Sequence, residues 1–348
     1  MSYFSIIIPV YNRAGIMDIC VNSILRQTFE DYEVVFVDDG SVDASPSVIR
    51  DYCSKDKRFR YVAHEKNESV LVSRYTGMRN SDGEYVLFAD SDDYLSENAL
   101  ELIYDSLQKE PVDILRFGNE EVYHDCTTAG KLIHEKNRCI PPLRTDDPLG
   151  AVLNDLMSPN VVKNCYSRKV VEKVLSRAEL FYCNMGEDVY WSTVFFNCAE
   201  SDGVLDECLY HYNIGGGMST SANGHTLEQL AGYQKHLRDC IEHVRSYLSR
   251  YDAERVALTD RKFLRMNCFL MLTFIIDEPD PCKTVDYLKA FDTEELRSVY
   301  RHGCRKILPF KFQRQYRVTD ETLDALNIPH GRFQVNYLED LIKNDFES

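Results

Sequence analysis

The first 110 residues alternate short apolar stretches with stretches of helical periodicity, and this alternation limits the fold more than any other feature. The apolar stretches are rich in Ile, Val and Phe, and each ends in a polar turn. This pattern is typical of buried parallel strands joined by helices. We therefore expect an α/β fold with a mostly parallel central sheet flanked by helices. The expected strands lie within residues 4–12, 32–41, 59–65 and 81–93.

Polar residues cluster where three of these strands end, at residues 9–12, 38–41 and 90–93. In parallel sheets, ligands bind beyond the carboxyl ends of the strands, so we expect the clusters to line one pocket. In the last cluster Asp90 and Asp92 stand beside Asp93, and their charges repel one another at neutral pH. A bound divalent cation would offset that repulsion, and a well-solvated acidic loop is the alternative.

Four motifs follow one another along the chain: SIIIPVYN at 5–12, SILRQTFEDYEVVFVDDGSVD at 23–43, GEYVLFADSDD at 83–93 and MGEDVYW at 185–191. In type, order and spacing they resemble family-2 glycosyltransferases, which invert configuration at the sugar and have the GT-A fold. The resemblance implies transfer of a hexosyl or N-acetylhexosaminyl group from a nucleotide-sugar, usually a UDP-sugar. The acceptor would be a hydroxyl of a glycan or lipid-linked molecule, in surface polysaccharide biosynthesis.

The resemblance assigns donor contacts to residues that would border the base, the ribose or the diphosphate: Pro9, Tyr11, Asp39, Arg74, Asp90 and Ser91. Asp39 would hydrogen-bond the base, and the alternative is that it caps the turn in DDGS. Arg74 would meet the diphosphate or the base, with a structural salt bridge as the alternative. The segment before Arg74 departs from the family pattern, because Ser69 stands where a glycine is usual.

Asp90-Ser91-Asp92 matches the DXD motif of the family, whose second aspartate ligates Mn²⁺ or Mg²⁺. Asp92 is therefore the leading expected metal ligand, with Asp90 as a second ligand and His211 as an additional one. The cation would act as a Lewis acid on the leaving diphosphate. His211 stands between two tyrosines, so a strand histidine that faces solvent is the alternative.

Asp188, in the sequence GED, matches the general base that removes the proton from the acceptor hydroxyl. The alternative is that Glu187 and Asp188 only favour the N-terminus of the following helix through their charge.

Two other functions also remain open. A nucleotidyltransferase shares the α/β sheet and the metal carboxylates, although residues 9–17 lack a basic Gly-rich loop. A catalytically inactive sugar-nucleotide-binding module is the third possibility.

The periodicity changes near residue 225, where we place a domain boundary. Residues 1–225 are expected to form the GT-A catalytic domain, with a nucleotide-sugar-binding half at 1–112 and an acceptor half at 113–225. Apolar residues at helical spacing predict a mainly helical region at 226–348. Gly215–Gly217 would belong either to a loop that closes over the donor or to a flexible linker.

The net charge of -16 over 348 residues disfavours nucleic-acid binding, which relies on basic surfaces. The twelve cysteines include no C-x-x-C pair, so we expect reduced thiols in a cytoplasmic protein, without a zinc site or a disulfide framework.

Residues 301–317 carry six Lys or Arg and no acid. We interpret them as a peripheral contact with the inner face of the cell membrane, near a polyprenyl-linked acceptor. A solvated or protein-docking face is the alternative.

Overall fold

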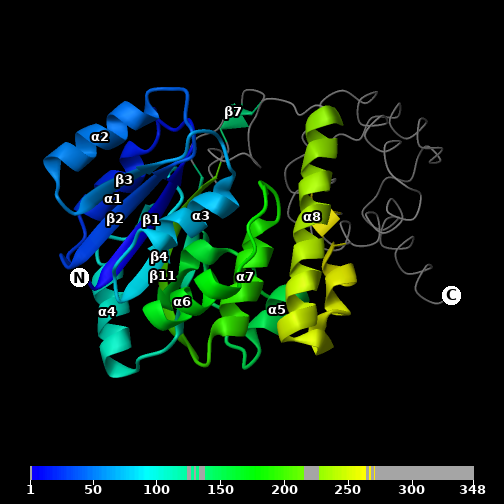
Figure 1. Ribbon diagram of the computed structural model, residues 1–348. Coiled ribbons are helices and arrows are strands. Elements are labelled where there is room, and N and C mark those ends of the chain that lie inside the picture. The colour runs from blue at the N-terminus through cyan, green and yellow to red at the C-terminus, as the bar shows by residue number, and fades with distance from the viewer. Residues whose placement is uncertain are drawn as a thin grey trace. The chain divides into compact units, whose positions relative to one another are not determined.

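The computed structural model describes residues 2–123, 127–128, 131–132, 138–214, 227–263, 266–267 and 270 (Figure 1). Contacts divide the chain into two units. The first contains Met1–Ser221 together with Asp239–Val256, and the second contains Ala222–Arg238 together with Ala257–Ser348. Among the described helices, none combines the length and the apolar character that a membrane-spanning segment needs.

The first unit is built around a mixed β-sheet. Its strands are β1 (Phe4–Val10), β2 (Tyr32–Asp38), β3 (Phe59–Ala63), β4 (Tyr85–Phe88), β5 (Tyr94–Leu95), β6 (Ile114–Tyr123), β9 (Arg138–Ile140), β10 (Asn164–Ser167) and β11 (Asp202–Ile214). The order across the sheet is β3-β2-β1-β4-β10-β6-β11-β5, and β9 also pairs with β6. The strands from β3 to β4 are parallel, whereas β10 runs antiparallel to both of its neighbours. Two short strands, β7 (Thr127–Thr128) and β8 (Lys131–Leu132), pair separately.

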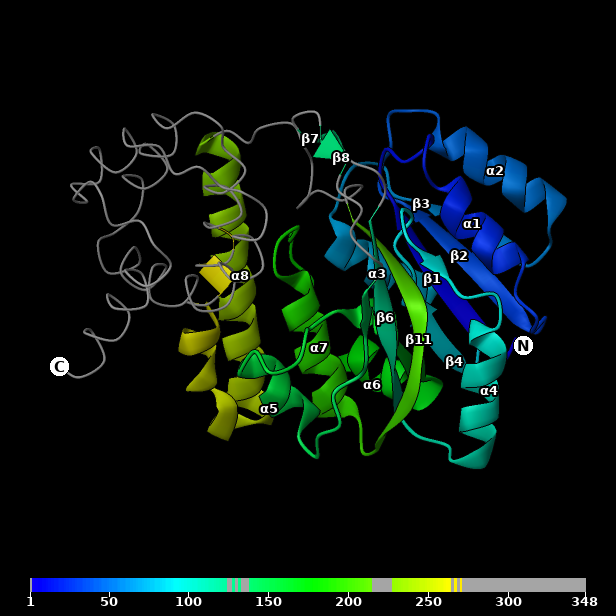
Figure 2. The same ribbon diagram turned by 180° about the vertical axis from the view of Figure 1, so that it is seen from behind.

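Helices cover both faces of this sheet. One face carries α1 (Asp18–Leu25), α2 (Ser45–Lys55) and α4 (Ala99–Lys109), which Figure 2 shows in front of the strands. The other carries α3 (Val70–Arg79), α6 (Arg168–Arg177) and α7 (Glu187–Cys198), as Figure 1 shows. The remaining helical elements are α5 (Pro148–Leu153), η1 (Val161–Lys163), α8 (Leu227–Tyr251) and η2 (Ala253–Arg255). The strand order reverses at β1, and α/β proteins bind ligands beyond the strand ends at such a point.

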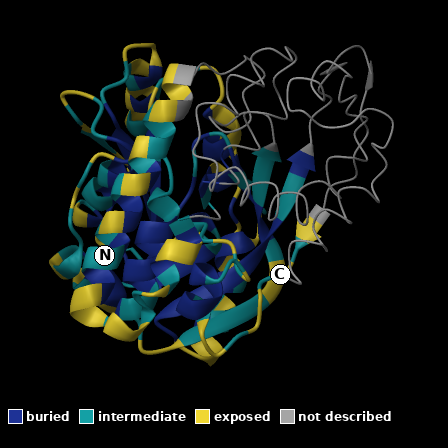
Figure 3. Ribbon diagram, turned by 90° about the vertical axis from the view of Figure 1, so that its right-hand side faces the viewer, coloured by how far each residue is buried: buried dark blue, intermediate teal, exposed yellow. Residues whose placement is uncertain are grey.

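The core explains the apolar sequence of the central strands. Every residue of β2 and β4 is buried, and β1 is buried except for its partly exposed Pro9. Figure 3 shows buried residues concentrated along the strands and exposed residues on the outer sides of the helices. Strands that are covered on both faces need apolar side chains at every position, which is why these segments do not alternate. The predicted α/β class and the parallel N-terminal part of the sheet are therefore confirmed.

The sequence of residues 113–225 suggests a mixture of strands and loops, and the structure also forms helices there. α6 begins after Ser167, whose side chain accepts a hydrogen bond from the Val170 N–H at 3.3 Å and so caps the helix. Its buried side chains are Val170, Val171 and Val174, which lie on one face. Because valine favours strands by propensity, tertiary packing and the serine cap decide this helix.

One disulfide joins Cys139 in β9 to Cys208 in β11. The expectation of reduced thiols without a disulfide was wrong for this pair. β9 and β11 both pair with β6, so the sheet brings together two cysteines that are 69 residues apart in sequence. Sequence spacing cannot reveal such a pair. The other cysteines of the described part of the chain are thiols: Cys20, Cys53, Cys165, Cys183, Cys198 and Cys240.

In the second unit, the described residues are mainly helical. Gln234 of α8 donates a hydrogen bond to the Asn267 side chain at 3.0 Å, and the Arg238 guanidinium lies 5.9 Å from the centre of the Phe263 ring. The boundary near 225 and the helical nature of the whole C-terminal region stay predictions. Gly215–Gly217 and residues 301–317 lie outside the described residues.

Candidate active site

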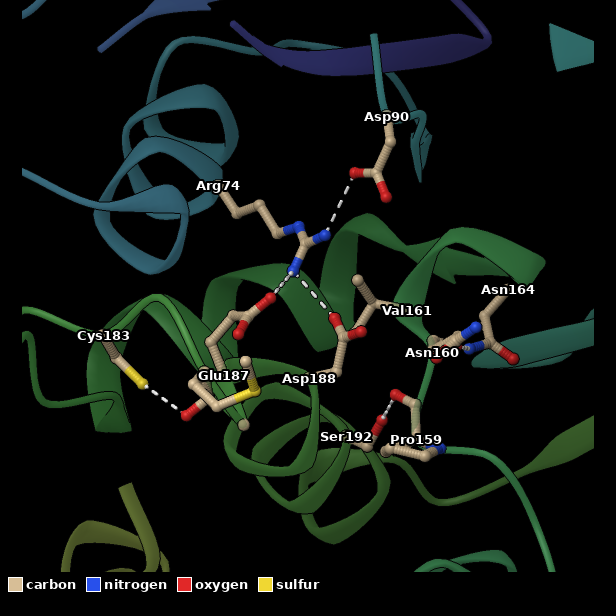
Figure 4. Close-up of polar contacts among 12 residues, drawn as sticks. Arg74, Asp90, Pro159, Asn160, Val161, Asn164, Cys183, Glu187, Asp188 and Ser192 are labelled. Atoms are coloured by element: carbon tan, nitrogen blue, oxygen red, sulfur yellow. Dashed lines mark hydrogen bonds and ion pairs between the residues drawn. The ribbon is translucent and has the colours of Figure 1, made fainter. Parts of the chain in front are cut away.

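Arg74 of α3 is the centre of the candidate active site (Figure 4). Its side chain is only 3% exposed. Nη2 donates a hydrogen bond to Asp90 Oδ1 at 3.1 Å, and Nη1 donates one to Asp188 Oδ1 at 2.8 Å. Glu187 Oε1 lies 3.5 Å from the same Nη1. The guanidinium therefore joins the DXD segment, which follows β4, to the first turn of α7. The structural alternative for each residue is therefore also present, because Arg74 forms salt bridges and Asp188 lies in the first turn of α7.

Burial and mutual contacts set the charges of these groups. Burial raises the pKa of Asp188, although Arg74 opposes the shift, and repulsion from Asp90 adds to it. Burial and the Asp188 charge raise the pKa of Glu187 to about 7. Burial disfavours the charge of Arg74, but its three carboxylate partners outweigh that effect and raise its pKa. Asp188 is therefore a stronger proton acceptor than an ordinary aspartate, which suits a general base.

The acidic loop after β4 is fixed by the end of β11. Asp93 is buried, and it accepts hydrogen bonds from Tyr210 Oη at 2.6 Å and from the Asn213 N–H at 2.8 Å. The Tyr210 hydroxyl also accepts a hydrogen bond from the Asp90 N–H at 3.1 Å. Burial and the charge of Asp90 raise the pKa of Asp93 to about 8. Asp93 therefore ties the acidic loop to the sheet through Tyr210 and Asn213.

Asp92 and Asp90 are the side chains of this loop that could offer oxygen ligands to a magnesium or manganese ion. The Asp92 backbone carbonyl accepts a hydrogen bond from the Asn213 side chain at 3.2 Å. Burial and the charge of Asp90 raise the pKa of Asp92, so a cation would relieve an unfavourable charge. Within the described residues, no group of three or more His, Cys, Asp or Glu could hold a metal ion. Magnesium commonly uses only one or two carboxylates together with substrate phosphates, and the metal-binding role of Asp92 and Asp90 stays a prediction.

The structure pairs His211 with residues other than the two aspartates. Its ring stacks on Tyr94 at 4.5 Å between ring centres. Nε2 lies 2.8 Å from Ser96 Oγ, and Nδ1 lies 2.8 Å from Glu120 Oε2. These contacts bind β11 to β5 and β6. The predicted metal-binding role of His211 stays a prediction, and it would require the ring to leave these partners.

Asp39 is buried and holds the loop at residues 64–69. Its Oδ1 accepts a hydrogen bond from the Glu68 N–H at 2.8 Å and lies 2.8 Å from His64 Nδ1. Its Oδ2 accepts a hydrogen bond from the Ser69 N–H at 3.0 Å. Because these contacts engage both oxygens, Asp39 has a structural function, and the predicted contact with a nucleobase stays a prediction.

The other predicted donor-binding residues follow the parallel strands. Tyr11 follows β1 directly, and its side chain is among the exposed apolar groups, at 44%. The Asn12 N–H donates a hydrogen bond to Ser41 Oγ at 3.0 Å, which joins the first polar cluster to the second. Pro9 lies in β1, and Ser91 is buried within the acidic loop. The structure thus places these residues at the carboxyl edge that the sequence predicted.

Two groups of site residues carried no signal in the sequence. Tyr210 and Asn213 reach the acidic loop only through the pairing of β11 with β5 and β6. Lys163 lies in η1, where burial lowers the pKa of its ammonium group and the charge of Asp188 opposes that shift. Its Nζ donates a hydrogen bond to Asn119 Oδ1 at 3.4 Å. None of these residues belongs to a local motif.

Comparisons with known proteins identify the family of the N-terminal residues and proteins of similar sequence and fold. Residues 5–157 match the sequence model described as glycosyl transferase family 2. These residues belong to glycosyl transferase family 2. Proteins similar to this chain include two from Bacillus subtilis, the uncharacterized glycosyltransferase EpsJ and the putative glycosyltransferase EpsH. They are 31% identical over 211 residues and 35% identical over 215 residues, respectively. Each match covers 60% of this chain and 60% of the relative, so the chain spans less than two thirds of either protein.

A solved structure has a fold similar to that of this chain. The crystal structure of S. aureus TarS 1-349 in complex with UDP-GlcNAc has a TM-score of 0.53 to this chain. The likeness covers 92% of this chain and 95% of that chain, at 15% sequence identity. At this identity the likeness concerns the fold alone, and it confirms the predicted GT-A architecture.

Proposed function

We propose that this chain transfers a sugar from a nucleotide-sugar to an acceptor hydroxyl, with inversion at the anomeric carbon. The observation that carries the proposal is the buried Arg74 guanidinium, which contacts Asp90 of the DXD segment and also Asp188. The Arg74 guanidinium thereby fixes the distance between Asp90 and the candidate base, Asp188. A single displacement requires such an arrangement, because the acceptor must be deprotonated on one side of the sugar while the diphosphate leaves on the other.

Asp188 would take the proton of the acceptor hydroxyl during the attack. Arg74 occupies Oδ1 of Asp188, so Oδ2 is the oxygen that the acceptor would meet. The Asp188 side chain is 27% exposed, which gives a hydroxyl access to it. Arg74 keeps its charge throughout, because its pKa is raised, and it therefore orients the base without competing for the proton.

Asp92 and Asp90 would hold Mn²⁺ or Mg²⁺, and the bound ion would offset the charge of the leaving diphosphate. We propose a UDP-sugar as the donor, and support comes from TarS, which shares the fold and whose crystal structure is a complex with UDP-GlcNAc. Pro9, Tyr11 and Asp39 would border the nucleotide. All three lie at the carboxyl ends of β1 and β2, where α/β proteins bind ligands.

For the acceptor, we propose a hydroxyl of a glycan or of a polyprenyl-linked sugar in surface polysaccharide biosynthesis. The basic and apolar composition of residues 301–317 motivates a peripheral contact with the membrane that carries such a lipid. Flotation with anionic liposomes tests the contact, because the chain should rise with the vesicles at low salt. Absence of binding to anionic vesicles would contradict it.

The activity is tested by UDP release from UDP-glucose, UDP-galactose and UDP-N-acetylglucosamine in the presence of Mn²⁺. We expect slow release from at least one donor, and we expect it to disappear with EDTA and in the Asp92→Ala variant. Asp188→Asn should retain donor binding, measured by calorimetry, while release is lost. Release of pyrophosphate from a nucleoside triphosphate would instead indicate a nucleotidyltransferase. Binding without turnover would indicate an inactive module.

A further inference from the structure

The short segment that leads into α7, residues 183–186, determines where Asp188 points; we call it the base loop. It ends at Gly186, which has a φ of 90° and immediately precedes the helix. No side chain caps α7 there, so the usual means of fixing a helix start is missing. Asp188 is the second residue of α7. The contacts of the base loop must therefore set the direction of the first helical turn.

Two buried thiols hold the base loop, Cys183 from within the loop and Cys240 from α8. Cys183 Sγ donates a hydrogen bond to the Met185 carbonyl at 3.2 Å, a contact that Figure 4 shows. Cys240 Sγ, on α8, donates one to the Gly186 carbonyl at 3.0 Å. A hydrogen bond between the Cys183 and Cys240 side chains, together with burial, raises the pKa of Cys240, so this thiol keeps its proton and remains a donor. Both side chains are fully buried.

Ser69 anchors the other end of the base loop. Its Oγ accepts a hydrogen bond from the Cys183 N–H at 3.1 Å, and it is fully buried. Ser69 has φ 86° and ψ 157°, a conformation that only glycine adopts readily. A serine therefore stands where glycine would be less strained, and its hydroxyl is the feature that glycine lacks. Strain of this kind is commonly held at functional sites.

We propose that the Ser69 hydroxyl and the Cys240 thiol are positioning residues that hold the base loop, and through it Asp188, in the orientation for proton transfer. The proposal rests on the proposed function, because it treats Asp188 as the base. Ser69 also donates its N–H to Asp39 Oδ2 at 3.0 Å, and that contact does not depend on the side chain. A change of the Ser69 side chain should therefore leave the donor side of the site in place.

Ser69→Gly separates positioning from stability. Glycine relieves the backbone strain and removes the hydroxyl. We expect the melting temperature to stay the same or rise, while kcat for UDP release falls at least tenfold and the donor KM changes less than twofold. A role limited to structure would move stability and kcat in the same direction, so an unchanged kcat in S69G would overturn the proposal for Ser69.

The Cys240 contact is tested by a pair of variants and a matched control. Cys240→Ala removes the donor, whereas Cys240→Ser keeps an O–H that can donate to Gly186. The control is Cys198→Ala, because Cys198 Sγ lies 3.6 Å from Tyr247 Oη and makes a similar buried contact between α7 and α8 far from Asp188. We expect kcat to fall at least tenfold in C240A only. Equal kcat in C240A and C198A would overturn the proposal for Cys240.

Hydrogen–deuterium exchange gives a measurement that does not need activity. The peptide covering residues 184–190 should exchange several-fold faster in S69G and C240A than in the unmodified chain, C240S and C198A. Equal exchange in all five proteins would overturn the proposal even if UDP is released. If no donor is turned over, the proposed function fails, and the exchange result alone decides whether Ser69 and Cys240 hold the loop.

Discussion

Replacement of Arg74 by methionine tests whether one buried cation holds the candidate active site together. Methionine is long enough to fill much of the space, but it leaves Asp90, Glu187 and Asp188 without their common partner. Breaking a buried ion pair typically costs about 3–5 kcal/mol of unfolding free energy. The three carboxylates are 33%, 15% and 27% exposed, so solvent screening places the expected cost at the lower end, at about 3 kcal/mol. For a domain of this size, that corresponds to a fall in Tm of about 6–12 °C.

The pH dependence of this loss has a definite sign. Arg74 opposes the effect of burial on the pKa of Asp188 and of Glu187, so both pKa values should rise further in R74M. When these groups take up protons, their mutual repulsion disappears. The difference in Tm between R74M and the unmodified chain should therefore be largest near pH 8 and smaller near pH 5.5. Differential scanning calorimetry across this range measures it.

Arg116→Met is the matched control for activity. Arg116 is also buried, and it donates hydrogen bonds to Asp202 Oδ2 from Nε at 2.9 Å and from Nη2 at 2.6 Å. Both variants should lose comparable stability. Only R74M should lose kcat/KM for UDP release, by about 100-fold, because only Arg74 orients the base. Equal kcat/KM in the two variants, measured below both melting temperatures, would refute the assigned role of Arg74.

Three further predictions follow from contacts within the site. Glu187→Gln removes a carboxyl group whose pKa is raised to about 7 in the folded chain. A carboxyl group with a raised pKa lowers the free energy of unfolding at a pH above that pKa, and has no such effect at a pH below the pKa of an ordinary glutamate. Thermal melts should therefore show that E187Q raises Tm more at pH 8 than at pH 5, and a pH-independent change would contradict this. Gly40→Ala places a Cβ 2.5 Å from the Lys66 carbonyl carbon, at a residue whose φ is 73°. Urea unfolding should therefore show a free energy of unfolding lower by about 2 kcal/mol, and UDP-release kinetics should show a higher donor KM. Tyr210→Phe removes the hydroxyl that donates a hydrogen bond to Asp93 at 2.6 Å and so fixes the acidic loop. Half-maximal UDP release should then need several-fold more Mn²⁺. An unchanged Mn²⁺ requirement would contradict this role of Tyr210.

The class of fold was predictable from the sequence because its signals are local. β1, β2 and β4 are buried along almost their whole length, so each had to be a continuous apolar stretch. Their polar ends follow directly in the chain, and parallel pairing of β1 with β2 and β4 brings those ends to one edge. α6 was missed, since its valines favour a strand and only the Ser167 cap and the packing make it a helix.

The candidate site was predictable only in part. Asp90, Asp92 and Asp188 belong to local motifs, so the family resemblance could single them out, and their roles stay predictions. The contact of Arg74 with both Asp90 and Asp188 depends on how α3 and α7 pack on the same face of the sheet, and no spacing in the sequence encodes that distance.

The sequence by itself determined the parallel strands, the acidic strand end and the family, because each depends on residues that are adjacent or regularly spaced. Only the tertiary structure decided which charges meet, that Tyr210 fixes the acidic loop, that Cys139 pairs with Cys208, and that a strained Ser69 contacts the base loop. The physical reason is that burial and electrostatic interaction act through space. A carboxylate's pKa and orientation therefore depend on neighbours that can lie far away along the chain.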